Sequence, residues 1–199
     1  MAEKLSDQEI VRRQKMQDLI DKGIKPFGHA YNRTHHSAQL KSLYGEKTKE
    51  ELEELQINVS VAGRIMSKRR MGKIGFIHLL DKEGQIQVVV NKAVVGDDVY
   101  EIFKASDIGD IIGVEGQVIK TDSGELSVRT ATYTHLTKAL RPLPEKFHGL
   151  TDKEERFRRR YVDLIMNDDA RRIAFTRPKI IRAIQRFFDS KGLVEVETP

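Results

Sequence analysis

The chain has 199 residues, of which 39% are hydrophobic and 33% are charged, a composition typical of a charge-rich globular protein rather than a disordered tail. It has no cysteine, which excludes disulfides, thiolate zinc sites and cysteine nucleophiles and favours a reducing compartment. No apolar run is long enough to span a membrane and the N-terminus lacks a signal core, so a cytoplasmic location without membrane contact is expected. The net charge of +5 arises entirely after residue 137, which indicates a polyanionic partner such as nucleic acid.

Residues 1–56 are expected to form a helical extension. The first helix is predicted over Ser6–Lys22, with Ser6 as its N-cap and Gly23 as its stop, because these residue types favour the two ends of a helix. A second, acidic helix is predicted over Lys49–Leu55. The histidines between the two helices fit no standard ligand spacing, so no metal site is expected. The apolar residues that recur at near-helical spacing in the first helix are Ile10, Val11, Met16, Leu19 and Ile20.

Residues 57–136 change from the helical period to a period of two, which indicates β-strands. A basic run, Ser67–Lys73, is predicted to be a loop after the first strand, and Asp97–Lys104 a short helix. The order of three strands, a helix and two strands matches a five-stranded OB barrel, whereas five strands are too few for a two-sheet sandwich. The predicted strands are Val59–Met66, Gly75–Leu80, Gln85–Val90, Ile111–Ile119 and Leu126–Tyr133.

Residues 137–166 are interpreted as a proline-containing linker, and residues 167–199 as the start of a further domain. An amphipathic helix is predicted there, with Pro178 at its start or at a kink and Gly192 at its end. A strand is predicted over Leu193–Glu197. Because a domain rarely ends one strand after a long amphipathic helix, the chain is interpreted as truncated. The apolar stripe of this helix consists of Ile180, Ala183, Ile184 and Phe187, widened by Ile181 and Phe188.

Alternation along the central hairpin of the barrel predicts that Phe76, His78 and Gln87 share its outer face. OB folds bind single strands on this face, between the loops that follow the first and fourth strands. An aromatic ring can stack on a base, and a glutamine amide matches the edge of a uridine. His78 is interpreted as a bystander, and the competing interpretation is that Phe76 is barrel core with the register shifted by one residue. The flanking loops supply Lys68, Arg69, Arg70, Lys73 and Glu125.

The remaining residues form no catalytic pattern. There is no pairing of a nucleophile with a base, no glycine loop for phosphates and no pair of carboxylates on an apolar strand. No catalytic residue, metal or cofactor is therefore expected within the chain. The spacing of the residues alone predicts a barrel that binds single-stranded RNA or DNA, joined to part of another domain.

Three stretches of the chain, Val61–Val90, Thr137–Asn167 and Phe187–Pro199, resemble the bacterial class II lysyl-tRNA synthetases. The last stretch resembles class II motif 1, although Leu193 stands where the motif usually carries an aromatic residue. The resemblance covers the whole chain. It implies an α+β fold: an N-terminal helical extension, an OB-fold anticodon-binding domain, and the motif 1 helix and strand that begin a class II catalytic domain.

The resemblance also implies roles for single residues. Phe76 and Gln87 match the positions that stack on and hydrogen-bond the middle uridine of the lysine anticodon, and Arg69 and Glu125 match positions that contact its neighbours. The expected partner is the anticodon stem-loop of tRNA(Lys), and DNA is not expected. The anticodon site expected from the resemblance and the basic loop together is Phe76, Gln87, Arg69, Glu125, Lys68 and Arg70. The dimer interface expected from motif 1 is Ile180, Ile184, Phe187, Phe188, Gly192 and Pro199.

The resemblance further implies the reaction of a parent enzyme. That homodimer would activate lysine with ATP and Mg²⁺ to lysyl-adenylate and transfer it to tRNA(Lys). The two ATP-binding motifs that follow motif 1 in the family are absent from these residues, so the chain itself is expected to be inactive. Three alternatives remain: an aspartyl- or asparaginyl-type synthetase fragment, a free-standing single-stranded RNA-binding OB module, and a dimerisation fragment.

Overall fold

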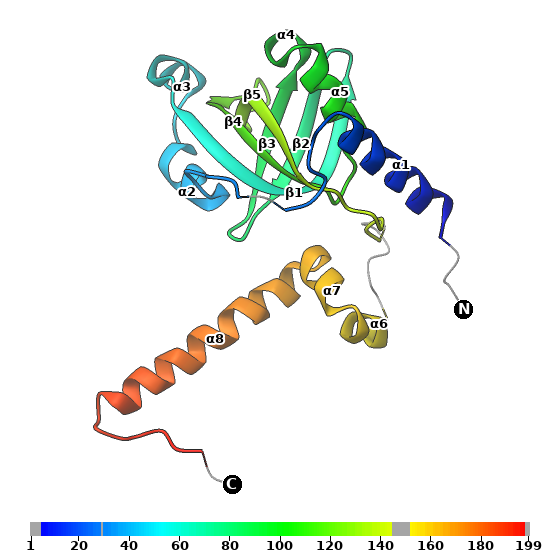
Figure 1. The fold of residues 1–199 in the computed structure, drawn as a ribbon. Helices are drawn as coiled ribbons and strands as arrows, with labels where there is room; N and C mark the ends of the chain where they lie inside the picture. Colours follow the sequence, from blue (N-terminus) through cyan, green and yellow to red (C-terminus); the bar gives the residue numbers. More distant parts are fainter. Residues whose placement is uncertain (1–4, 29, 145–151, 198–199) are drawn as a thin grey trace. The chain divides into compact units, whose positions relative to one another are not determined.

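The structure, a computed structural model, describes residues 5–28, 30–144 and 152–197. The chain divides into two units, residues 1–142 and residues 143–199, and the division lies inside the segment predicted to be a linker. Figure 1 shows the barrel with its surrounding helices in the first unit and a run of helices in the second. In the part of the chain that the structure describes, no helix is long and apolar enough to cross a membrane.

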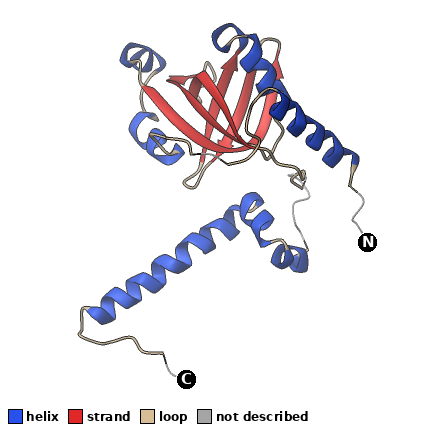
Figure 2. Cartoon of the chain, in the orientation of Figure 1, coloured by secondary structure: helices blue, strands red, loops and turns tan. Residues whose placement is uncertain are grey.

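The first unit is built on a closed five-stranded barrel in the order β1-β2-β3-β5-β4. Strands β3 and β5 pair in parallel, and the other neighbours pair antiparallel. This topology confirms the predicted OB fold, and Figure 2 shows the strands curling around one another with the helices outside them. The strands are β1 (Asn58–Met71), β2 (Ile74–Leu80), β3 (Gln85–Asn91), β4 (Ile111–Lys120) and β5 (Leu126–Thr137).

The first strand is longer than predicted. The basic segment after Met66 was expected to be a loop, and this prediction is wrong, because Arg69 pairs with Phe76 in the β1–β2 ladder. A register shift between Ile65 and Ser67, typical of a β-bulge, interrupts the alternation of buried and exposed residues there. The pattern in the sequence therefore stops at the bulge, although the strand continues through it.

The barrel interior is closed at one end by Phe103 from α5 (Asp97–Ala105), a helix that confirms the prediction over Asp97–Lys104. Phe103 is fully buried, and its ring centroid lies 5.3 Å from that of Tyr100 and 6.2 Å from that of Tyr133. A Cβ on Gly75 would lie 2.2 Å from the tip of the Phe103 ring. Only glycine therefore fits at this point of β2, directly before Phe76.

Helix α1 (Asp7–Asp21) begins as predicted, with Ser6 as N-cap in a capping box with Glu9. Only two side chains of the helix are buried, Arg12 and Leu19. Arg12 donates hydrogen bonds to the carbonyl oxygens of Ala139 (2.9 Å) and Ile108 (3.1 Å). Of the apolar residues that recur at near-helical spacing, this narrow line of attachment therefore buries Leu19 alone and leaves Met16 half-buried. Those that are exposed are Ile10, Val11 and Ile20.

Three short helices complete the first unit. Helix α3 (Lys49–Leu55) has the predicted bounds, whereas α2 (Ser37–Tyr44) and α4 (Lys92–Val95) were not predicted. The start of α2 combines a local cap, in which Gln39 Oε1 accepts from the His36 N–H (2.8 Å), with a tertiary contact, in which Asp81 accepts hydrogen bonds from both the backbone N–H (2.6 Å) and the hydroxyl (2.7 Å) of Ser37. A contact between residues so far apart in the sequence leaves no local signal.

The second unit consists of α6 (Lys153–Arg158), α7 (Arg160–Met166) and α8 (Asp168–Asp189). The predicted amphipathic helix is α8, and Pro178 lies inside it, which excludes the alternative that this proline begins the helix and leaves the alternative of a position within it. The strand predicted over Leu193–Glu197 is not formed. A strand needs a neighbour for its hydrogen bonds, and no described segment pairs with these residues.

Candidate nucleic-acid interface

The outer face of β1, β2, β3 and β5 carries two rows of side chains that follow from the strand registers. Ile77, Val88 and Val128 have no exposed surface, so the residues on either side of each point out of the barrel. The first row runs through Arg69, Phe76, Val89 and Arg129. The second row runs through Ser67, His78, Gln87 and Ser127.

Phe76 lies on the outer face and is half-buried. Its neighbours along β2 include Ile77, which is fully buried in the barrel. The register is thus the expected one, and the competing interpretation of Phe76 as barrel core is wrong. Across the ladders Phe76 stands between Arg69 and Val89. The Phe76 side chain is therefore partly open to solvent on the outer face of the barrel.

Gln87 points outward as expected, but Glu125 covers it. The amide Nε2 of Gln87 donates to Glu125 Oε2 at 2.6 Å, and Ser127 Oγ donates to Gln87 Oε1 at 2.8 Å. Glu125 Oε1 also lies 3.0 Å from His78 Nε2, and the other ring nitrogen of His78 lies 2.7 Å from Ser67 Oγ. Gln87 is consequently only 4% exposed. His78, interpreted from the sequence as a bystander, is part of this network.

Lys68 is not a free cation on this face. Its ammonium donates hydrogen bonds to the carbonyl oxygens of Phe103 (2.7 Å), Lys104 (2.9 Å) and Ser106 (2.6 Å) and lies 4.7 Å from the centroid of the Phe103 ring. It therefore satisfies the carbonyl groups at the end of α5. Burial lowers the pKa of Lys68 to about 8, against the opposing charge of Asp107. The expectation that Lys68 contacts RNA is corrected to a structural role.

The lowered pKa of Lys68 predicts a pH dependence of stability. Between pH about 8 and 10.5 Lys68 is protonated in the unfolded chain and deprotonated in the folded protein. The contribution of Lys68 to the free energy of unfolding therefore rises with pH across this range. We expect the free energy of unfolding of the wild type, relative to Lys68→Met, to increase across this range. Urea unfolding at several pH values measures it. The Lys68→Arg variant keeps its charge in both the folded and the unfolded state, so its free energy of unfolding should change with pH in the same way as that of Lys68→Met. If the difference in free energy of unfolding between wild type and Lys68→Met does not change with pH, the prediction is contradicted.

Arg69 and Arg70 are exposed near the end of β1, and Arg129 is half-exposed on β5. Arg129 lies across from Val89 in the β3–β5 ladder, so it ends the same row that Arg69 begins. Arg129 is not among the site residues predicted from the sequence. Alternation within Leu126–Tyr133 could have found it, because that alternation places Arg129 on the outer face once Val128 is assigned to the interior.

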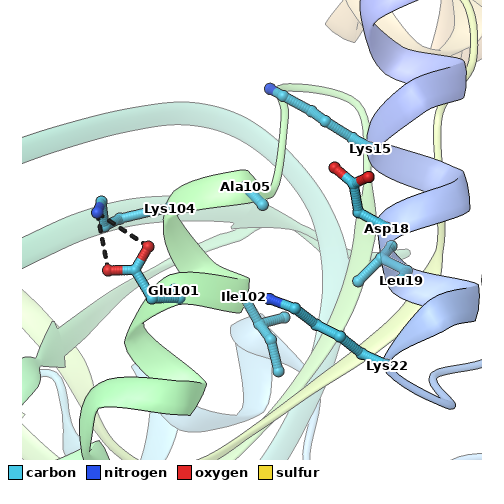
Figure 3. A pocket seen from close by; sticks show the side chains of 8 residues that line it. All are labelled: Lys15, Asp18, Leu19, Lys22, Glu101, Ile102, Lys104 and Ala105. Atoms are coloured by element: carbon cyan, nitrogen blue, oxygen red, sulfur yellow. Dashed lines mark hydrogen bonds and ion pairs between the residues drawn. The ribbon is translucent and has the colours of Figure 1, made fainter.

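A separate hollow of about 290 Å³ lies between α1 and α5 (Figure 3). Its lysines are largely paired with carboxylates: Lys104 lies 2.8 Å from Glu101, and Lys15 lies 2.6 Å from Asp107. The described residues contain no group of three or more side chains that could hold a metal ion. The outer face of the barrel is therefore the stronger candidate site.

Two protein families match the chain. The family of OB-fold nucleic acid binding domains matches residues 59–136, and the class II tRNA synthetases (D, K and N) match residues 152–199. Lysine–tRNA ligases from Lactococcus lactis subsp. cremoris and Bacillus subtilis are each 58% identical over 99% of this chain, and the one from Streptococcus mutans is 56% identical over the same share. The chain spans 40% of the length of each of these relatives.

Proposed function

Given the relationship of this chain to the class II lysine–tRNA ligases over nearly its whole length, we propose that its barrel binds the anticodon stem-loop of tRNA(Lys). The observation that carries the proposal is the row in which Phe76 and Val89 stand between Arg69 and Arg129, with Gln87 in the neighbouring row. This row lies on the face that OB folds use for single strands.

Each side chain has a chemical role in the proposed complex. Phe76 stacks on an unpaired base, which is worth about 1–3 kcal/mol. Gln87 hydrogen-bonds the edge of that base, and the guanidinium groups of Arg69, Arg70 and Arg129 neutralise phosphates or stack on neighbouring bases. Glu125 contacts a flanking base once it has left Gln87. The middle uridine of the lysine anticodon is the base proposed for Phe76 and Gln87.

We propose that the whole protein catalyses the reaction for which its relatives, the lysine–tRNA ligases, are named. Lysine and ATP, with Mg²⁺, form lysyl-adenylate and pyrophosphate, and the lysyl group is then transferred to tRNA(Lys) with release of AMP, in the cytoplasm. The second unit would contribute the surface between two subunits, because α8 exposes Ile180 (55%), Ile184 (50%) and Phe187 (57%). The remaining residues expected at that surface are Phe188, which is 47% exposed, Gly192, with a φ of 73°, and Pro199, which lies outside the described residues.

A fluorescence titration tests the proposed function. The chain is titrated with a stem-loop carrying the lysine anticodon, with the same loop carrying a central cytidine, and with a loop carrying an aspartate anticodon. Preference for the lysine loop over both others supports the proposal. Equal binding of the lysine and aspartate loops supports an aspartyl- or asparaginyl-type reader instead, and binding of all three that disappears in moderate salt indicates a nonspecific polyanion-binding barrel.

Arg129→Ala is expected to weaken binding of all stem-loops severalfold and to reduce the salt dependence by about one unit of slope, because a phosphate contact carries no sequence information. Titrations at several salt concentrations measure both effects. The matched control is Arg33→Ala. Arg33 is an exposed arginine in a segment whose backbone hydrogen-bonds to Ser60 of β1. An unchanged salt slope in Arg129→Ala, or a loss confined to one loop, contradicts the prediction.

A further inference from the structure

The orientation of the Gln87 amide decides which base edges it can bind. The two ends of a glutamine amide have nearly the same shape, but one end donates hydrogen bonds and the other accepts them. The contacts of Gln87 distinguish the two ends on chemical grounds. An ionised carboxylate only accepts, so the group 2.6 Å from Glu125 Oε2 must be the NH₂ of Gln87.

The opposite end of the amide is held by Ser127. Ser127 has no exposed surface, and its hydroxyl lies 2.8 Å from Gln87 Oε1 and 3.1 Å from the backbone carbonyl oxygen of Glu125. Both neighbours are acceptors, so the single hydroxyl proton of Ser127 is shared between Gln87 Oε1, the nearer of the two, and the carbonyl oxygen of Glu125. The parallel pairing of β3 with β5 places Ser127 directly opposite Gln87. The donor is therefore fixed by the closure of the barrel and not by a mobile loop.

We propose that Ser127 is a positioning residue that holds the Gln87 amide with its NH₂ toward the RNA face, where the Glu125 carboxylate occupies the place of a base oxygen in the free protein. This inference rests on the proposed function, in which Gln87 contacts a base. A base with an acceptor oxygen at that edge, such as uridine, can take over the hydrogen bond when Glu125 leaves. Cytidine presents an amino donor there and faces a second donor.

The network around Glu125 is consistent with a carboxylate that is held but can be released. Glu125 itself is exposed, whereas the Gln87 that it covers is 4% exposed. Its second oxygen lies 3.0 Å from His78 Nε2, so the carboxylate keeps a partner on β2 when a base takes its place at the Gln87 amide. In this arrangement Gln87 never loses a hydrogen-bond partner, which avoids the penalty of an unpaired buried amide.

The test compares Ser127→Ala with wild type for stem-loops that differ only in a central uridine or cytidine. Without the donor, the amide can turn its oxygen outward and accept from cytidine. The Kd of the cytidine loop divided by the Kd of the uridine loop is expected to fall at least about fivefold, mainly because the cytidine loop binds more tightly. Ser60→Ala is the matched control, since Ser60 is a buried serine on β1 whose hydroxyl lies 3.0 Å from both the carbonyl oxygen of Asn32 and the hydroxyl of Tyr31 instead of near Gln87. Its ratio should not change.

The outcomes separate this inference from the proposed function. If the wild type does not prefer uridine, both fail. If the wild type prefers uridine and Ser127→Ala prefers it equally, only the positioning role is overturned. In a Gln87→Ala background, Ser127→Ala should have no further effect on the ratio, and an effect there would assign Ser127 a merely structural role. Should Ser127→Ala not fold, Ser127→Cys keeps the volume with a weaker donor and should lower the ratio partially, while an unchanged ratio overturns the proposal.

Discussion

Phe76→Ala is expected to weaken binding of the lysine-anticodon stem-loop by roughly 1–3 kcal/mol, which is about 5- to 150-fold in Kd. The ring lies on the outer face between Arg69 and Val89, so its loss removes a stacking surface and leaves the barrel interior intact. Fluorescence titration at fixed salt measures the change in Kd, and urea unfolding of the same variant shows that the fold is kept.

Two further variants sharpen this result. Phe76→Tyr keeps a ring on the same face and should retain most of the affinity, because stacking depends on the π-surface. Phe27→Ala removes an aromatic side chain that is 47% exposed elsewhere in the same unit and should leave the Kd unchanged. If Phe76→Ala loses no more affinity than Phe27→Ala, the outer face of β2 is not the binding surface.

Lys138→Met is expected to lower the free energy of unfolding of the first unit by about 3–5 kcal/mol, because it leaves a buried carboxylate without its counter-charge. Asp110 has no exposed side-chain surface and accepts hydrogen bonds from Lys138 Nζ at 2.8 and 3.0 Å. It also accepts from the backbone N–H groups of Ala139 and Asp107, both at 2.8 Å. These contacts join the end of β5 to the loop before β4. Urea unfolding measures the change.

Lys15→Met is the matched control for this substitution. Lys15 pairs with Asp107 at 2.6 Å, as Lys138 does at 2.7 Å, but 29% of the Lys15 side chain is exposed against 1% for Lys138. A partly hydrated pair contributes at most about 1 kcal/mol, so Lys15→Met should cost far less. Equal losses in the two variants would show that burial of the Asp110 charge is not the cause.

Local patterns predicted much of the barrel. Helix α3 has the predicted bounds, and the five strands occur in the predicted order, because alternation and capping depend on residues close together in the sequence. The outward direction of Phe76 followed from the same alternation. The predictions that failed depended on distant contacts: α2 begins where Asp81 holds Ser37, and β1 continues through its bulge because β2 pairs with it.

The sequence by itself determined the fold class, the order of the five barrel strands and the face of the hairpin on which Phe76 and Gln87 lie. Only the tertiary structure decided what these side chains and their neighbours contact. In the folded protein the ammonium of Lys68 donates hydrogen bonds to carbonyl oxygens at the end of α5 and does not face solvent with the rest of the basic segment. Arg129 lies in the same row of side chains as Phe76. The tertiary structure also placed Glu125 and Ser127 at the two ends of the Gln87 amide. The reason is that alternation specifies the direction of a side chain, whereas its hydrogen-bond partners come from strands that meet only when the barrel closes.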